Sequence, residues 1–172
     1  MLNWRRNITL VALYAAAFFL QYGVLNNLGW GVFCPQLLLF FPVFAGVLRG
    51  SYHGFCHGLV CGLLQDMLIG RFIGLNLLVW ALVGALCGMF TRGLFKENYL
   101  VAIVSVLGSW AVGCMVYALL AGMLSGDFFS MSRISQIILG GALANCFLAP
   151  IIYVPVYRSL LYGWLKPLSK QS

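Results

Sequence analysis

The chain has 172 residues, of which 63 % are hydrophobic, and its mean hydropathy is +0.99. Only 8 % of the residues are charged, whereas a water-soluble domain draws about a quarter of its residues from Asp, Glu, Lys and Arg. This composition excludes an ordinary cytosolic enzyme, a disordered chain and a disulfide-stapled secreted domain. The length fits one compact unit, so the sequence predicts a single integral membrane domain over residues 1–172.

Six apolar runs follow one another between charged and turn residues, at 7–25, 35–48, 51–68, 75–90, 100–124 and 135–157. The first run follows Arg5 and Arg6, as in a signal peptide, but Phe18, Phe19 and Leu20 extend it past any cleavage site, so we expect an uncleaved helix. About 20 residues cross the hydrocarbon core as a helix; runs one, five and six reach that length comfortably, and the other three are short. We predict an all-α bundle of six transmembrane helices with short loops.

The second and third runs allow two arrangements. One is a re-entrant hairpin, which would bury Arg49 at its tip; the other is a pair of short or tilted helices with Arg49 at the membrane interface. We expect the pair of helices, because burying an arginine in lipid is costly. Both arrangements return the chain to the same side of the membrane.

The basic residues indicate the orientation. With a cytoplasmic N-terminus, eight basic residues lie inside and two outside: Arg5, Arg6, Arg49, Arg92, Lys96, Arg158, Lys166 and Lys170 against Arg71 and Arg133. The positive-inside rule applies to such short connections, so we predict both termini in the cytoplasm. The net charge of +7 is then a topology signal rather than a nucleic-acid-binding surface, and the basic tail is expected along the anionic inner leaflet.

The third run and the turn after it carry small residues at a spacing of four: Gly54, Gly58, Gly62, Asp66, Gly70 and Gly74. Positions four apart stack on one helix face, so the first three glycines form a groove without side chains that ends in a carboxylate. Each interior glycine costs about 1 kcal/mol relative to alanine, which close helix packing must offset. The groove therefore packs against either a neighbouring helix of this chain or a helix of another protein.

Asp66 is the acidic residue inside a predicted span, since Glu97 and Asp127 lie in connections. A carboxylate at the bilayer centre costs ~2.5–3.5 kcal/mol on insertion scales, which makes Asp66 a candidate functional residue. At the outer end of the third helix it has three possible roles: capping the following turn, pairing with Arg71, or accepting hydrogen bonds from a partner. A proton relay is disfavoured, because no second acid or histidine lies at this depth.

Two other patterns carry weaker signals. His53, His57 and Cys61 also recur every four residues, as zinc ligands on a helix would, but the spacing supplies no fourth ligand, so we expect ordinary interfacial histidines. In the last run Pro150 is expected to kink the helix, and Asn145 to bond a carbonyl that the kink frees. The chain has no phosphate-binding loop, paired carboxylates or zinc-protease motif, so we expect no catalytic residue, metal or cofactor.

The run CPQLLLFFPV, the series from Gly58 through Asp66 to Gly74, and Asn145 with Pro150 resemble the MreD family of bacterial rod shape-determining proteins. The resemblance implies a non-enzymatic scaffold of the inner membrane within the rod complex. It implies direct binding to MreC and, through the complex, links to MreB filaments, a RodA-type glycosyltransferase and a penicillin-binding transpeptidase of peptidoglycan synthesis. It also implies a fold similar to the substrate-binding subunits of energy-coupling-factor transporters. The histidines and cysteine of the third run have no counterpart in the family pattern.

Two other functions compete with the scaffold. A vitamin-transporter subunit that captures its substrate would need polar groups that converge within the spans, and Asn76, Gln136 and Asn145 are few for that purpose. A lipid-modifying enzyme is excluded, since His53 and Asp66 would lie ~20 Å apart on one helix. We expect the scaffold, with no small-molecule pocket. Its predicted packing or partner-binding residues are Gly54, Gly58, Gly62, Asp66, Gly70, Arg71, Gly74, Asn145 and Pro150.

Overall fold

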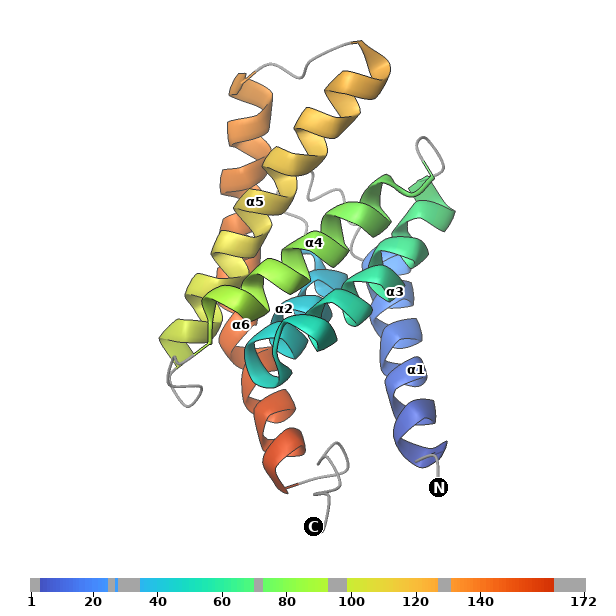
Figure 1. Ribbon diagram of the computed structural model, residues 1–172, viewed down its shortest axis with the longest axis vertical. Helices are drawn as coiled ribbons and strands as arrows, with labels where there is room; N and C mark the ends of the chain where they lie inside the picture. Colours follow the sequence, from blue (N-terminus) through green and yellow to red (C-terminus); the bar gives the residue numbers. More distant parts are fainter. Residues whose placement is uncertain are drawn as a thin grey trace.

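The computed structural model describes residues 4–24, 27, 35–69, 73–92, 99–126 and 131–162 (Figure 1). These residues form six α-helices and a short π-helical segment, with no strand among them. The elements are α1 (Trp4–Phe19), η1 (Leu20–Val24), α2 (Leu37–Arg49), α3 (Ser51–Ile69), α4 (Leu75–Phe90), α5 (Tyr99–Ser125) and α6 (Met131–Tyr162). The bounds lie close to the predicted apolar runs, so the all-helical prediction is confirmed.

The length and composition of the helices indicate a membrane protein. Two stretches, Leu100–Ser125 in α5 and Ser132–Val154 in α6, are long and apolar enough to cross a bilayer, while the stretches Val11–Gly23, Leu37–Arg49 and Leu75–Phe90 are shorter apolar helices. Large apolar side chains such as Leu119 and Phe147 point outward from the bundle and are well exposed. A soluble monomer rarely exposes so much apolar surface, whereas lipid accepts it.

Helix α2 is the centre of the bundle, because it contacts each of the other five α-helices. Its Leu39, Val43 and Val47 side chains are at most 1 % exposed and form the main core with residues of α4, α5 and α6. Phe44 packs edge-on against Tyr153 of α6, with ring centroids 5.1 Å apart. Figure 1 shows α5 and α6 as a long pair on one side and α1 on the other.

A single residue, Gly50, joins α2 to α3. Its φ is +97°, a conformation that residues with a side chain rarely adopt, and its amide donates to the carbonyl of Gly46 at 2.9 Å. Arg49 is the last residue of α2 and is half-buried. The chain therefore reverses direction in one step, which places α2 and α3 side by side and presents both of them to α4.

Candidate functional site

The glycine face of α3 lies directly against the backbone of α4. A Cβ atom added at any of the three α3 glycines would overlap backbone atoms of α4, in the pairs Gly54 with Gly84, Gly58 with Trp80, and Gly62 with Leu77. Glycines of α4 and α2 complete this α3–α4 seam: a Cβ at Gly46 would lie 2.7 Å from the carbonyl oxygen of Gly84. Helix α4 of the same chain therefore fills the groove, and these positions are closed to a helix from another protein.

Asp66 caps the N-terminus of α4 from the neighbouring helix. One carboxylate oxygen accepts hydrogen bonds from the backbone N–H groups of Gly74 and Leu77, at 2.9 and 3.0 Å. The other accepts from the backbone N–H of Asn76 at 3.1 Å and from its side-chain amide at 2.9 Å. The first N–H groups of a helix lack partners within the helix and favour a negative charge, so the carboxylate, 2 % exposed, is well matched.

Capping is thus the role of Asp66 that the structure shows, among the three that the sequence allowed. Gly74 precedes α4 with φ at +95°, which turns the chain so that its N–H points at the carboxylate. Gly70 and Arg71 lie outside the described residues. We call the end of the bundle where α3 ends and α4 begins the Asp66 end.

Asn145 has a different partner from the predicted one. Its side-chain oxygen accepts a hydrogen bond from the backbone N–H of Gln36 at 3.0 Å, just before α2 begins. Its Nδ2 is fully buried and has no hydrogen-bond partner among the described residues, so it does not bond a carbonyl freed by Pro150. Helix α6 continues through Pro150. The prediction was wrong because a residue distant in sequence offered an unpaired donor at the start of α2.

A network of glutamines gathers at the Asp66 end. Gln36 Oε1 accepts hydrogen bonds from Gln21 Nε2 at 2.8 Å and from Gln65 Nε2 at 3.3 Å. Gln65 Oε1 in turn accepts from the indole N–H of Trp80 at 2.5 Å, and Gln21 Oε1 from the backbone N–H of Leu38 at 3.0 Å. Side chains from η1, the start of α2, α3 and α4 are therefore tied together.

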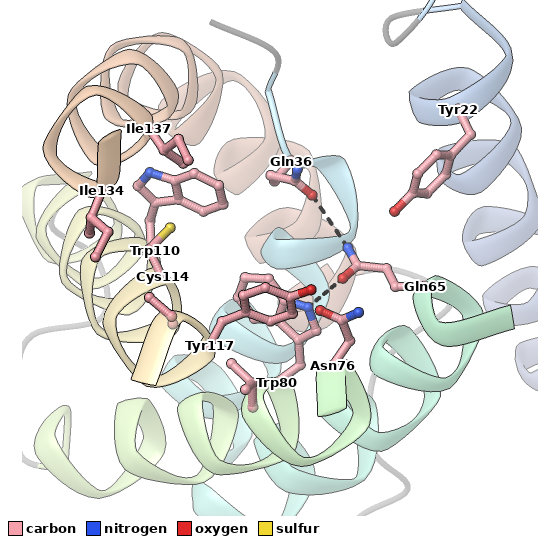
Figure 2. A pocket seen from close by; sticks show the side chains of 13 residues that line it. Tyr22, Gln36, Gln65, Asn76, Trp80, Trp110, Cys114, Tyr117, Ile134 and Ile137 are labelled. Atoms are coloured by element: carbon pink, nitrogen blue, oxygen red, sulfur yellow. Dashed lines mark hydrogen bonds between the residues drawn. The ribbon is translucent and has the colours of Figure 1, made fainter. Parts of the chain in front are cut away.

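The glutamine network borders a cavity of about 220 Å³ (Figure 2). Its lining comes from η1, from Gln36 just before α2, and from α3, α4, α5 and α6. It comprises Tyr22, Gln36, Gln65, Asn76, Val79, Trp80, Trp110, Gly113, Cys114, Tyr117, Ala118, Ile134 and Ile137. Among the described residues that line it, none is charged. The sequence predicts no cavity within the bundle, whereas the structure has one at the Asp66 end.

The sequence pattern does not single out Gln21, Gln36 and Gln65, because each is a single polar residue near the end of an apolar run. Their shared depth was the available signal: all three fall toward the predicted outer ends of their runs, as does Asn76. Antiparallel helices bring such positions together at one end of a bundle. Gln136, one of the candidate polar groups in the spans, is exposed on α6 and does not line the cavity.

A second hollow, which we call the α4–α5 groove, has a volume of about 430 Å³. It is mostly apolar and is lined by Val83, Leu86, Cys87, Phe90, Thr91, Leu100, Val101, Val104, Ser105, Gly108, Ser109 and Val112. A Cβ added at Gly108 would meet no atom within 4 Å. Gly108 therefore faces open space rather than another helix of the chain.

The histidines of α3 lie in different surroundings. His53 is exposed, whereas His57 is half-buried and its Nδ1 is hydrogen-bonded to the hydroxyl of Tyr14 on α1. Cys61 is 1 % exposed and packs with Tyr14 and Leu38 in a small core that joins α1, α2 and α3. His57 is thus a packing residue rather than an ordinary interfacial one. In the described part of the chain, no three potential metal ligands come together.

Comparison with known proteins identifies a family. A family model described as rod shape-determining protein MreD matches residues 5–159, which is most of the chain. No curated protein and no solved structure matches. The matched range includes the whole α3–α4 seam, the glutamine network and the α4–α5 groove.

Proposed function

Because this chain belongs to the MreD family of rod shape-determining proteins, we propose that it is a non-enzymatic scaffold of the bacterial inner membrane that binds MreC. Through the rod complex, MreC would connect it to MreB filaments, a RodA-type glycosyltransferase and a penicillin-binding transpeptidase. The family gives a role in determining rod shape. A scaffold role in rod shape determination is compatible with a closely packed bundle of apolar helices.

The proposal includes a topology. The six α-helices form a single domain that crosses the membrane six times, with both termini in the cytoplasm and the Asp66 end facing the outside. The excess of basic residues on the cytoplasmic side supports this orientation. The proposed fold is similar to that of the substrate-binding subunits of energy-coupling-factor transporters, which also consist of six helices.

The α4–α5 groove is the observation that carries the scaffold proposal. Helices in lipid associate through close packing at small residues, since burial away from lipid gains little. The α3 glycines are already covered by α4, whereas a Cβ added at Gly108 would meet no atom within 4 Å, and Ser105 and Ser109 lie beside it in the groove. A single transmembrane helix fits such a surface. We therefore assign the groove to the membrane helix of MreC.

Co-purification from native membranes tests this assignment. Gly108→Leu adds a side chain in the groove at a position where a Cβ meets no atom within 4 Å, and we expect it to recover about tenfold less MreC, which corresponds to a loss of ~1.4 kcal/mol. Ala16→Leu is the matched control, because Ala16 is exposed on α1, away from the groove. Equal recovery of MreC with both variants would place the partner on another surface.

The cavity keeps a second candidate function open, that of a subunit which captures a small solute for transport. The convergence of Gln36, Gln65 and Asn76 on one cavity is the observation that favours it. Uptake separates the two candidates: a transporter subunit delivers its solute across the membrane of intact cells, whereas a scaffold with the same cavity does not. We favour the scaffold because the family is defined by cell shape.

A further inference from the structure

We propose that the cavity at the Asp66 end binds an uncharged molecule whose amide, or a similar planar group with a donor beside an acceptor, lies against Gln36, Asn76 and Tyr117. The apolar or ring portion of this molecule packs among the tryptophans of the cavity. This binding is independent of the scaffold role, since the cavity and the α4–α5 groove share no lining residue.

The polar side of the cavity has hydrogen-bonding groups left over. The Oε1 atom of Gln36 already accepts two hydrogen bonds, while its Nε2 donates to no described residue. The Nδ2 atom of Asn76 donates to Asp66, which leaves the Oδ1 acceptor without a partner among the described residues. Figure 2 shows the Tyr117 hydroxyl directed toward Gln65 and Asn76. A donor, an acceptor and a hydroxyl from three elements therefore remain to be satisfied at one place.

The network holds these groups in place before any ligand arrives. Asn76 is fixed by the Asp66 carboxylate, and Gln36 by Gln21, Gln65 and the contact of its N–H with Asn145. Groups held in one geometry lose little entropy when they bind, which favours a specific polar contact over a loose one.

The walls of the cavity include two tryptophan rings, which are also held in place by hydrogen bonds. The indole N–H of Trp80 donates to Gln65 at 2.5 Å, and that of Trp110 donates to the carbonyl oxygen of Ile138 at 3.1 Å. The Trp110 ring also lies on Gly141 of α6, where a Cβ would overlap it. An apolar cavity of about 150 Å³ accommodates benzene, so 220 Å³ between such rings has room for a ring with a polar substituent.

The ligand is uncharged because the described lining offers no charge to pair with it. Moving an ion into a site without a counter-charge costs several kcal/mol. Water alone is a poor occupant, since apart from the polar patch the walls are rings and aliphatic side chains. A molecule with one amide-like end and one apolar end satisfies both parts of the cavity.

The test uses 4-fluorobenzamide as a probe, detected by fluorine NMR with the purified full chain in lipid nanodiscs. We expect saturable binding to the wild type, and at least about tenfold weaker binding of 4-fluorobenzoate, which is charged, and of 4-fluorotoluene, which has no hydrogen-bonding group. Binding of 4-fluorotoluene as tight as that of the amide would overturn the proposal, because the cavity would then select only for apolar character.

Two variants locate the binding. Ala118→Phe fills the cavity and should abolish saturable binding, whereas Ala16→Phe, on the exposed face of α1, should leave it unchanged. Tyr117→Phe removes one hydroxyl and should weaken binding about two- to tenfold, even if Ala118→Phe does not fold. Unchanged binding by Tyr117→Phe together with either unchanged binding by Ala118→Phe or failure of that variant to fold would contradict the proposal.

A neutral amide reaches the site from one of two sources, a lipid headgroup or a small solute in water. Displacement of the probe by oleamide added to the nanodiscs, at amounts where benzamide in the buffer has no effect, identifies a lipid. Displacement by benzamide but not by oleamide identifies a water-soluble molecule. Displacement by neither shows that the probe is bound without specificity and overturns the proposal.

Discussion

Helix α4 packs against α2, α3 and α5, and it meets α3 and α5 in opposite ways. On one side the α3–α4 seam brings backbone against backbone, with no room for a single carbon atom at Gly58. On the other side the α4–α5 groove leaves about 430 Å³ between the helices, and Gly108 faces open space. Both α3 and α5 carry small residues at helical spacing. The spacing therefore predicts that something packs closely, but not whether it belongs to the same chain.

The polar groups explain which contact is permanent. The seam ends in the four hydrogen bonds that Asp66 accepts from the start of α4, and breaking them would leave a buried carboxylate unsatisfied. The groove carries few polar side chains among its apolar residues, and one of them, Thr91, donates to the carbonyl oxygen of Cys87 at 2.7 Å. The seam is thus a fixed contact within the chain, whereas the groove is open at Gly108.

The largest loss of stability is expected from a substitution that adds a side chain inside the α3–α4 seam. Gly58→Leu forces α3 and α4 apart, and we expect a loss of more than about 3 kcal/mol in the free energy of unfolding, or no folded protein at all. The measurement is size-exclusion chromatography and detergent unfolding of the purified chain. Gly108→Leu is the control with the same added side chain and should stay folded. Equal stability of both variants would contradict the close backbone packing of α3 against α4 at Gly58.

The next effect concerns the cap. Asp66→Ala removes the acceptor for four donors at the start of α4, and we expect a loss of about 3 kcal/mol; Asp66→Asn keeps the shape and part of the accepting capacity and should lose about half as much. Circular dichroism during detergent unfolding measures both. If the alanine variant were as stable as the wild type, the carboxylate would not hold the seam together.

A smaller effect is expected at Asn145, which ties α6 to the start of α2. Asn145→Ala leaves the N–H of Gln36 without its acceptor and opens a small void, so we expect a loss of about 1–2 kcal/mol. Gln136→Ala, at an exposed position of the same helix, is the control and should change stability by less than ~0.5 kcal/mol. Similar losses in both variants would show that the bond to Gln36 contributes little.

The smallest change should differ in sign between the two sides of α4. Alanine at Gly108 meets nothing and has the higher helix propensity, so Gly108→Ala should raise the stability by about 0.5 kcal/mol. Alanine at Gly62 would overlap the backbone of α4, so Gly62→Ala should lower it by about 2 kcal/mol. Thermal melting of the two variants measures both changes in stability. If both variants were stabilised, or both destabilised, the proposed difference between the seam and the groove would be contradicted.

The helices could be predicted from the sequence because lipid demands long apolar runs, and charges and glycines mark their ends. Asp66 could be singled out because an acid in an apolar run needs partners. The identity of those partners could not be predicted, since the donors belong to the next helix and their positions depend on how the two helices approach each other. Asn145 shows the same limit: its bond to Gln36 joins residues 109 positions apart. The cavity could not be predicted, because isolated glutamines form no recognisable sequence pattern until the fold brings them together.

The position of the seam along the chain has a consequence for the order of assembly. It joins helices that are consecutive in the sequence, and α2, α3 and α4 together occupy the continuous stretch 37–90. Such short-range contacts form early, because little loop entropy is lost when they close. These three helices can thus unite while α5 and α6 are still being synthesised. The cavity, which needs side chains of both parts, is completed only when the last helix arrives.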